Sequence, residues 1–157
     1  MHIDFKPVQS EDLSLIGSWM ELVHWRQWWG DPDVELGYIK DMLEGRDPTR
    51  PFLFLIDGTP VGYIQYWRLK DAKKPPWNEA SPWVMQFDDD AIGVDLAIGP
   101  TDQLSKGIGT IAFRAFLQRL FNEGFTKIII DPDSANKRAI RAYEAATGIK
   151  IGYKPAG

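Results

Sequence analysis

The stretch that decides the fold runs from residue 91 to residue 110. It reads AIGVDLAI at 91–98, GPTDQ at 99–103 and LSKGIGT at 104–110. The first eight residues are apolar apart from Asp95, which is typical of a buried strand. An apolar stripe with helical spacing follows the two glycines of 104–110, so a helix is expected to begin near Lys106. Because the N–H groups that start a helix lack partners within it, this turn predicts a phosphate-binding loop. A plain turn before a helix fits the same residues.

A second distinctive stretch follows a strand predicted at 127–130. It reads DPDSANKRAIRAYE at 131–144. Asn136 and Tyr143 are seven residues apart and therefore share one helix face, with Ala139 between them. An amide and a phenol on one face suit a narrow, partly apolar groove. In the alternative interpretation, Asn136 caps the helix and Tyr143 is an ordinary amphipathic core residue.

The remaining patterns predict a mixed α/β fold in one domain over residues 1–157. Strands are expected at 2–7, 52–56, 61–67, 91–98, 127–130 and 149–153, with Asp57-Gly58 as a tight turn between the second and third. Helices are expected from a Ser10 N-cap through Val23 to a break at 25–30, from Asp31-Pro32 through about 43, from about 106 to 124, and from 134 or 136 to about 146. Residues 68–90 contain several prolines and an acidic run, which predict a long surface connection.

Composition excludes several classes of protein. The chain of 157 residues has no cysteine and a net charge of −4 at pH 7. It therefore has no thiol nucleophile, disulfide or thiolate metal ligand, and two scattered histidines predict no metal site. The acidic balance argues against nucleic acid as the main partner. No apolar run approaches the ~20 residues of a membrane-spanning helix, and the first residues lack a signal-peptide pattern, so a cytoplasmic protein without a membrane partner is expected.

Aromatic and acidic residues point to a binding pocket. Six of the seven tryptophans lie between Trp25 and Trp83, several beside glycine, proline or acidic residues, where a pocket wall is an alternative to plain core. Asp95 interrupts an apolar strand, where a carboxylate is costly unless it is paired or faces a cleft. Asp95 is therefore the candidate general base, or the anchor for a cationic acceptor. A solvated strand face is the alternative interpretation.

The two stretches together resemble the acyl-CoA pyrophosphate loop and the later strand–helix unit of the GNAT superfamily of N-acyltransferases. Three more segments look like its aminoglycoside 6′-N-acetyltransferase branch: HWRQWWG at 24–30, PVGYIQ at 60–65 and GVD at 93–95. The resemblance covers roughly residues 5–147. It implies a central, mostly antiparallel sheet with a splayed parallel pair, flanked by helices. It also implies an N-acetyltransferase that uses acetyl-CoA.

The resemblance further implies a set of site residues. The co-substrate would contact Asp95, Leu96, Ala97, Ile98, Lys106, Gly107, Ile108, Gly109, Thr110, Asp131, Asn136, Ala139 and Tyr143. Its pyrophosphate would lie on the backbone of 106–110, and its pantetheine arm would pair with 95–98 like an added strand. Asp95 and Tyr143 would be catalytic, Tyr143 by protonating the departing thiolate. Direct attack by the amine is favoured over a covalent intermediate because the chain has no cysteine.

The acceptor is expected to be a small cationic amine. It would contact Trp25, Trp28, Trp29, Asp31, Tyr63, Gln65, Trp77 and Asp95, through charge pairing and cation–π contacts. Further acidic residues, Asp33, Glu35, Glu79 and Asp88–Asp90, would add negative charge nearby, although 88–90 also fits a solvated loop. An aminoglycoside 6′-amine is the first expectation. A hydroxylysine-type siderophore precursor is the second, because the branch also resembles those acyltransferases.

A non-catalytic acyl-CoA-binding module is the alternative from another class of protein. The chain stops shortly after Gly148, where the resemblance implies a further hairpin that helps to close the acceptor pocket. A monomer or a homodimer is expected.

Overall fold

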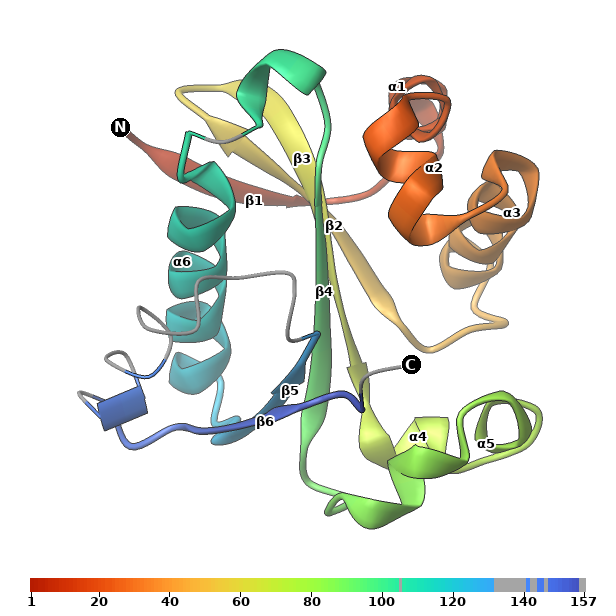
Figure 1. Cartoon of the computed structure of the whole chain (residues 1–157), viewed down its shortest axis with the longest axis vertical. Coiled ribbons are helices and arrows are strands. Elements are labelled where there is room, and N and C mark those ends of the chain that lie inside the picture. Colours follow the sequence, from red (N-terminus) through yellow and green to blue (C-terminus); the bar gives the residue numbers. More distant parts are fainter. Residues whose placement is uncertain (105, 132–140, 142–143, 146, 156–157) are drawn as a thin grey trace.

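The computed structural model describes residues 1–104, 106–131, 141, 144–145 and 147–155. Within them, six strands form one sheet in chain order: β1 (Ile3–Pro7), β2 (Arg50–Ile56), β3 (Thr59–Arg68), β4 (Ile92–Ile98), β5 (Lys127–Ile130) and β6 (Lys150–Tyr153). Strands β1 to β4 pair antiparallel, whereas β4–β5 and β5–β6 pair parallel (Figure 1). The mixed sheet expected from the sequence is confirmed. The Asp57-Gly58 turn has positive φ at both residues, as a two-residue hairpin with the sheet's twist requires.

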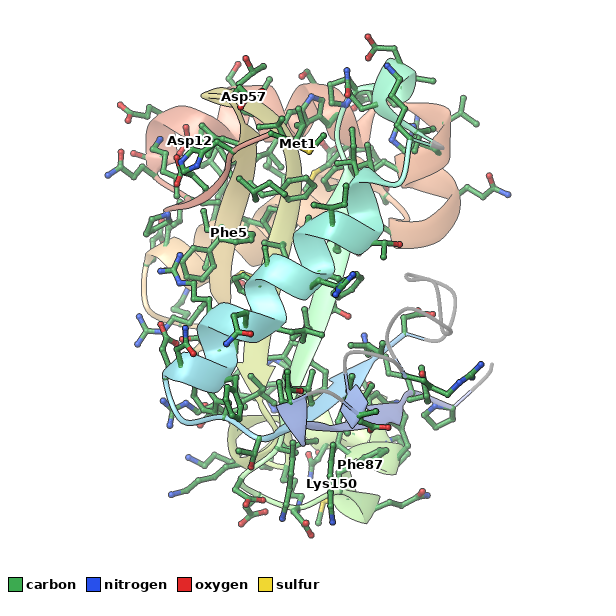
Figure 2. The ribbon with its side chains drawn as sticks, turned by 90° about the vertical axis from the view of Figure 1, so that its left-hand side faces the viewer. Met1, Phe5, Asp12, Asp57, Phe87 and Lys150 are labelled. Carbon is green, nitrogen blue, oxygen red and sulfur yellow. The ribbon has the colours of Figure 1, made fainter. Side chains whose placement is uncertain are left out.

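One face of the sheet is covered by α6 (Ile108–Asn122), which crosses it obliquely (Figures 1 and 2). The helix buries Phe113, Phe116 and Leu117 completely against strand residues that include Phe54 and Val94. Phe116 also packs on Phe5, with ring centroids 5.0 Å apart. This apolar stripe is the one that the sequence predicted after residue 106, and it makes α6 the main support of the central strands.

Three helices cover part of the opposite face: α1 (Leu13–Met20), α2 (Val23–Trp29) and α3 (Pro32–Leu43) (Figure 1). They enclose a second core that contains Trp19, Trp25 and Tyr63. Side chains therefore alternate along β4 as expected: Val94, Leu96 and Ile98 pack on the α6 side, and Ala97 packs on the α1–α3 side.

The first helical region differs in detail from the prediction. A short 3-10 turn, η1 (Ser10–Asp12), precedes α1, and the Asp12 carboxylate accepts a hydrogen bond from the Gln9 N–H, so Ser10 is not the N-cap. The helix ends at Met20, and α2 is a separate helix, ended by Gly30 at φ 103°. Val23 was expected on the apolar stripe but is 81% exposed, because the break between α1 and α2 changes the register of the face. The Asp31-Pro32 start of α3 is confirmed: Asp31 Oδ1 accepts from the Asp33 N–H at 2.9 Å.

The segment between β3 and β4 is not a plain surface connection. It contains α4 (Leu69–Ala72), α5 (Trp77–Ala80) and the 3-10 helix η2 (Pro82–Gln86). Leu69 and Val84 are buried with Ala91 and Ile129 in a third small core. The elements are too short to give a helical apolar period, which is why the prolines and acidic residues read as loop.

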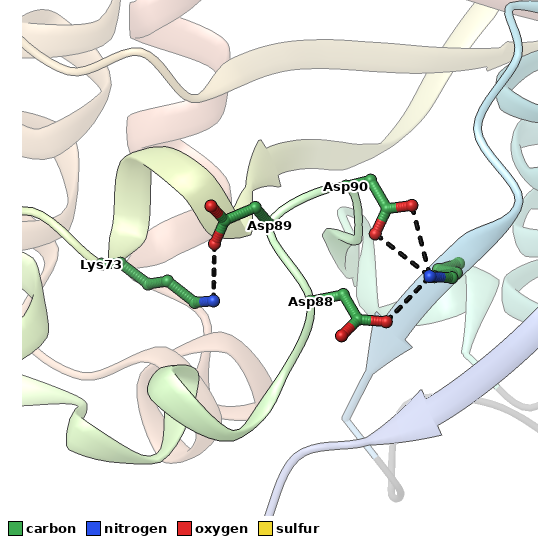
Figure 3. Close-up of polar contacts among 5 residues, drawn as sticks. Lys73, Asp88, Asp89 and Asp90 are labelled. Atoms are coloured by element: carbon green, nitrogen blue, oxygen red, sulfur yellow. Dashed lines mark hydrogen bonds and ion pairs between the residues drawn. The ribbon is translucent and has the colours of Figure 1, made fainter.

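The loop that carries Asp88, Asp89 and Asp90 lies at the surface. Asp89 pairs with Lys73 at 2.6 Å, and Asp88 and Asp90 pair with Lys127 (Figure 3). The hydrogen bond from the Lys127 ammonium, and then its charge, lower the pKa of Asp88. The interpretation as a solvated acidic loop is therefore the better one.

The last helix predicted from the sequence, from 134 or 136 to about 146, falls largely outside the described residues. In the described part of the chain, no helix has the length and apolar character needed to cross a membrane.

Replacing Phe116 with alanine should lower the free energy of unfolding by about 3–5 kcal/mol, because a fully buried ring leaves a cavity that the neighbouring strands cannot fill. Ile111 lies on the same helix but is 40% exposed, so Ile111→Ala should change that free energy by only about 0.5 kcal/mol. Urea denaturation followed by circular dichroism measures both. Equal losses in the two variants would contradict the assignment of α6 as the main support.

Candidate active site

Strand β5 pairs with β4 over three residues and ends at Ile130. Ile92, Gly93 and Val94 pair with 128–130, and the described pairing goes no further. The Gly99 N–H donates to Val61 O, so the odd-numbered residues of β4 point their backbone groups toward β3. Leu96 and Ile98 therefore point theirs toward the side on which β5 pairs with 92–94. Among the described residues no strand pairs with them on that side, so this edge of β4 is a candidate ligand-binding edge.

A cavity of about 470 Å³ opens beside this edge. Its walls come from α2, α3, β4, the turn before α6, and the segments that follow β5 and β6. The lining residues are His24, Trp25, Trp29, Glu35, Asp95, Leu96, Ala97, Ile98, Leu104, Asp131 and Lys154. His24 Nε2 lies 2.9 Å from Ile98 O, which joins α2 to the open edge. The cavity thus brings the expected strand 95–98 together with Trp25, Trp29 and Asp131.

Asp95 is bonded by three side chains in this cavity. Its carboxylate is 16% exposed and accepts hydrogen bonds from Gln65 Nε2 at 3.1 Å and from Trp67 Nε1 at 2.8 Å. Tyr63 in turn donates its hydroxyl proton to Gln65 Oε1 at 2.6 Å. Tyr63, Gln65 and Trp67 occupy alternate positions of β3 and therefore share a face, with Gln65 directly opposite Asp95.

Trp67 reaches Asp95 because Gly93 has no side chain. A Cβ at Gly93 would overlap the Trp67 indole ring. The glycine of the GVD segment thus makes room for a ring that donates to the aspartate two residues later. Trp67 was missing from the expected site residues, although its period-two relation to Tyr63 and Gln65 was a usable signal.

Lys154 is the cationic partner of Asp95. It follows β6, and its ammonium donates to Asp95 Oδ1 in an ion pair. The Lys154 side chain is 22% exposed, and Nζ lies 5.7 Å from the centroid of the Trp67 ring. Sequence reasoning missed this residue because no local pattern near 154 marks it; only the tertiary fold brings the segment after β6 to β4.

The pKa values of the two neighbouring carboxylates shift in opposite directions. For Asp95, burial favours the neutral form, but the charge and hydrogen bond of Lys154, with the bonds from Gln65 and Trp67, lower the pKa below its ordinary range. For Glu35, burial and then the negative charge of Asp95 raise the pKa. Burial, followed by the charge of Asp95, also raises the pKa of Tyr63 well above its usual value, so Tyr63 stays a neutral donor.

The turn before α6 has the geometry of a helix start. Gly107 is the N-cap at φ 74°. The first backbone hydrogen bond of the helix runs from the Ile111 N–H to Gly107 O at 3.1 Å. The N–H groups of Ile108, Gly109 and Thr110 therefore have no partner within the helix. The two glycines differ in role. A Cβ at Gly109 would contact Leu96 and Ile98 at 3.8 and 3.9 Å, so Gly109 faces β4, whereas a Cβ at Gly107 would meet nothing within 4 Å.

Other expected acceptor residues lie away from the cavity or behind its wall. Asp31 is an exposed helix cap, and Glu35, one turn later on α3, lines the cavity instead. Tyr63 is fully buried and acts through Gln65. Trp77 lines a neighbouring cavity of about 240 Å³, which also contains Trp67, Trp83 and Lys154. Trp77 therefore does not line the cavity that contains Asp95.

Some expectations fall outside the described residues. Asn136, Ala139, Tyr143 and the Trp28 side chain are among them, so their assigned roles stay predictions. Lys106 is described and exposed, next to the start of α6. No cluster of three or more metal-ligating side chains occurs within the residues that the structure describes.

The fold and the site together define an acyl-CoA-type acetyltransferase architecture, and a comparison with known families agrees. The family model for an acetyltransferase (GNAT) domain matches residues 8–153. The chain belongs to the GNAT acetyltransferase family.

Individual relatives narrow the likeness. Aminoglycoside N(6′)-acetyltransferase type 1 of Klebsiella pneumoniae is 30% identical in an alignment 152 residues long that covers 92% of this chain and 72% of the relative. A solved structure of AAC(6′)-Ib in complex with paromomycin and acetyl-CoA has a TM-score of 0.71 at 28% identity, covering 93% of this chain and 82% of that one. A structure of AAC(6′)-Ib with coenzyme A and kanamycin has a TM-score of 0.69 at 29% identity, covering 92% and 83%.

Replacing Trp67 with phenylalanine keeps most of the ring but removes the donor to Asp95. We expect the free energy of unfolding at neutral pH to fall by about 1.5–3 kcal/mol, as for hydrogen bonds to charged groups. The lowered pKa of Asp95 means that this contribution is present above the ordinary aspartate range and is lost as the pH falls through the folded-state pKa. The gap between wild type and variant should therefore shrink in acid. Urea titrations at several pH values measure it, with Trp77→Phe as the matched control; a gap that is constant with pH would contradict the role of Trp67.

Proposed function

We propose that this protein transfers the acetyl group of acetyl-CoA to a primary amine of an aminoglycoside, with the 6′-amine as the favoured position, and that it acts in the cytoplasm. The observation that carries the proposal is the half-buried Asp95 carboxylate at the first residue of β4 beyond its described pairing with β5, where it already holds a primary ammonium group. Family membership supports the acetyl transfer, and the names of the relatives support the acceptor class.

The described residues fit acetyl-CoA. The backbone groups of Leu96 and Ile98 lie beyond the described β4–β5 pairing and point to the same side, so a pantetheine arm with its two amides can pair there as an added strand. The N–H groups of 108–110 at the start of α6 suit the pyrophosphate, since a helix N-terminus favours an anion. Leu104 lines the same cavity as 95–98 and connects the two regions. The bound thioester supplies the activated acetyl group.

The acceptor side of the cavity suits a cationic amino sugar. Trp29 provides a partly exposed aromatic face, and the buried Trp25 packs against it with the ring centroids 5.6 Å apart. Glu35, Asp95 and Asp131 provide carboxylates in the same cavity. Rings and carboxylates together can bind a sugar ring and its ammonium groups by stacking, cation–π contact and charge pairing.

The chemistry assigned to the protein's own residues is short. Asp95 orients the acceptor ammonium and receives its proton, which exposes the nitrogen lone pair for attack. The Leu96 N–H, on the open edge, is the donor that would stabilise the developing oxyanion. Gln65 and Trp67 hold the carboxylate in one orientation throughout. Tyr143, as acid for the departing thiolate, and Asn136, as a pantetheine-amide partner, complete the proposed set.

Asp95→Asn should reduce turnover of an aminoglycoside by roughly 10²–10⁴-fold if Asp95 is the base, with CoA affinity retained, because the amide keeps its shape but not its basicity. If Asp95 only anchors the acceptor, KM should rise more than kcat falls. Thiol release gives the rates and isothermal titration gives the CoA affinity. Asp89→Asn, at a surface pair with Lys73, is the control and should behave as wild type. A folded Asp95→Asn protein with wild-type kcat/KM would refute the assignment.

Gly107→Ala should weaken CoA binding by about ten-fold or more, because the new Cβ projects into the space proposed for the pyrophosphate. A side chain at this positive φ also strains the backbone that carries the first N–H groups of α6. Gly124 ends the same helix, also with positive φ and with no atom within 4 Å of where a Cβ would lie, so Gly124→Ala carries similar backbone strain far from the cradle. Isothermal titration with CoA compares the two variants. Equal affinities would move the pyrophosphate away from this turn.

A panel of acceptors tests the proposed function as a whole. Thiol release should be fast with an aminoglycoside that carries an amine at the 6′ position and slow with one that carries a hydroxyl there. Preference for a hydroxylysine-type amine would favour the siderophore alternative. Binding of CoA with no thiol release from any acceptor would favour a non-catalytic module.

A further inference from the structure

The segment after β6 inserts a lysine into the proposed acceptor site. The Lys154 N–H donates to Ile130 O at 2.9 Å, which completes the parallel pairing of Ile130 with Tyr153. This bond fixes the start of the Lys154 side chain at the end of β5, beside the last described pair of β4 and β5. The side chain crosses to β4 and places Nζ on Asp95 Oδ1. Lys154 lines both the 470 Å³ cavity and the neighbouring 240 Å³ cavity, so it lies between them.

The position of Nζ is the position that the proposed function gives to the amine of the substrate. Nζ is a primary amine, it is bonded to the carboxylate that receives the acceptor, and it lies beside the open edge of β4. We propose that Lys154 is a second acceptor of the enzyme: without a small-molecule amine, the protein transfers the acetyl group of acetyl-CoA to its own Lys154 Nζ. The inference rests on the proposed function only in requiring acetyl-CoA along β4.

In the proposed acetyl transfer, Asp95 takes up the first proton and CoA is the leaving group. The Lys154 ammonium gives one proton to the Asp95 carboxylate, and the freed lone pair attacks the thioester carbonyl carbon. The new C–N bond forms, the C–S bond breaks, and CoA leaves as the thiolate. The acylated nitrogen releases a second proton, which neutralises the thiolate. The products are a neutral acetyl-lysine and free CoA thiol, with one proton left on Asp95 for release to water.

The surroundings of the other described lysines do not offer this reaction. Lys127 pairs with Asp88 and Asp90, and Lys73 pairs with Asp89, both at the surface (Figure 3). Lys150 begins β6, the strand that Lys154 follows, but it is exposed. Among the described lysines, Lys154 is the one that lines the cavity. Proximity to the bound thioester should therefore make its modification selective.

The experiment incubates the intact protein with acetyl-CoA and no other acceptor. Intact mass should rise by one acetyl group, and peptide mapping should place it on Lys154 at a rate at least about ten-fold above that of Lys150. The rate constant should not change when the protein is diluted, because the reaction is within one chain. Lys154→Arg, which keeps the cation, should abolish the selective modification, and Lys150→Arg should leave it intact. Circular dichroism confirms that the variants are folded.

Equal modification of Lys154 and Lys150, a rate that falls on dilution, or no acetyl-Lys154 would each overturn the inference. A parallel thiol-release assay with kanamycin separates it from the proposed function. Kanamycin acetylation without acetyl-Lys154 sinks the inference alone. Acetyl-Lys154 without turnover of any aminoglycoside supports the inference and sinks the proposed acceptor. Loss of both, with acetyl-CoA bound, overturns both.

Discussion

The end of the described β4–β5 pairing at Val94 is the constraint on which the site depends. A strand that loses its neighbour leaves backbone donors and acceptors that must find other partners, since an unmade hydrogen bond to a buried group costs about 1–3 kcal/mol. His24 lies within hydrogen-bonding distance of Ile98 O, which holds α2 against this edge. The Leu96 and Ile98 N–H groups face the cavity side instead. The end of this pairing and the cavity beside it thus leave both the space and the backbone groups that the proposed co-substrate needs.

Asp95 shows how the fold tolerates a carboxylate in an apolar strand. Burial disfavours its charge, and Gln65, Trp67 and Lys154 each compensate. Removing one partner of a buried ion pair is far more costly than exchanging it for another, because an unpaired charge is left behind. An incoming ammonium group that takes the place of Lys154 keeps Asp95 paired at every stage. Lys154 therefore keeps the Asp95 carboxylate charged and paired, which is the state that an amine acceptor needs. To replace Lys154, an acceptor must bind Asp95 more tightly than the lysine does.

Local patterns predicted much of the fold, and tertiary contacts account for what they missed. Alternation and the Asp57-Gly58 turn predicted the β2–β3 hairpin, and the apolar run around Asp95 predicted β4 with its lone carboxylate. The four-residue helices of 69–80 are shorter than one hydrophobic period can reveal. Val23 was misassigned because the apolar stripe of the first helix was extended past the end of α1.

The candidate site also contains residues that local patterns reveal and residues that they do not. The strand at 95–98 and the turn before α6 carry their signal locally, in a buried run and in two glycines, whereas Lys154 reaches Asp95 from 59 positions away in sequence. A single polar residue after a short strand has no local pattern that distinguishes it.

The preference for a cationic acceptor arises inside the cavity and not on the acidic loop. Asp88, Asp89 and Asp90 are engaged with Lys127 and Lys73 at the surface, where solvent and salt screen their field. In the cavity, Glu35 and Asp95 lie among the lining residues with Lys154, and the charge of Asp95 adds to burial in raising the pKa of Glu35. Charges act more strongly in this less hydrated space than on the surface, so a cationic acceptor is attracted chiefly by Asp95, whose lowered pKa keeps its carboxylate charged.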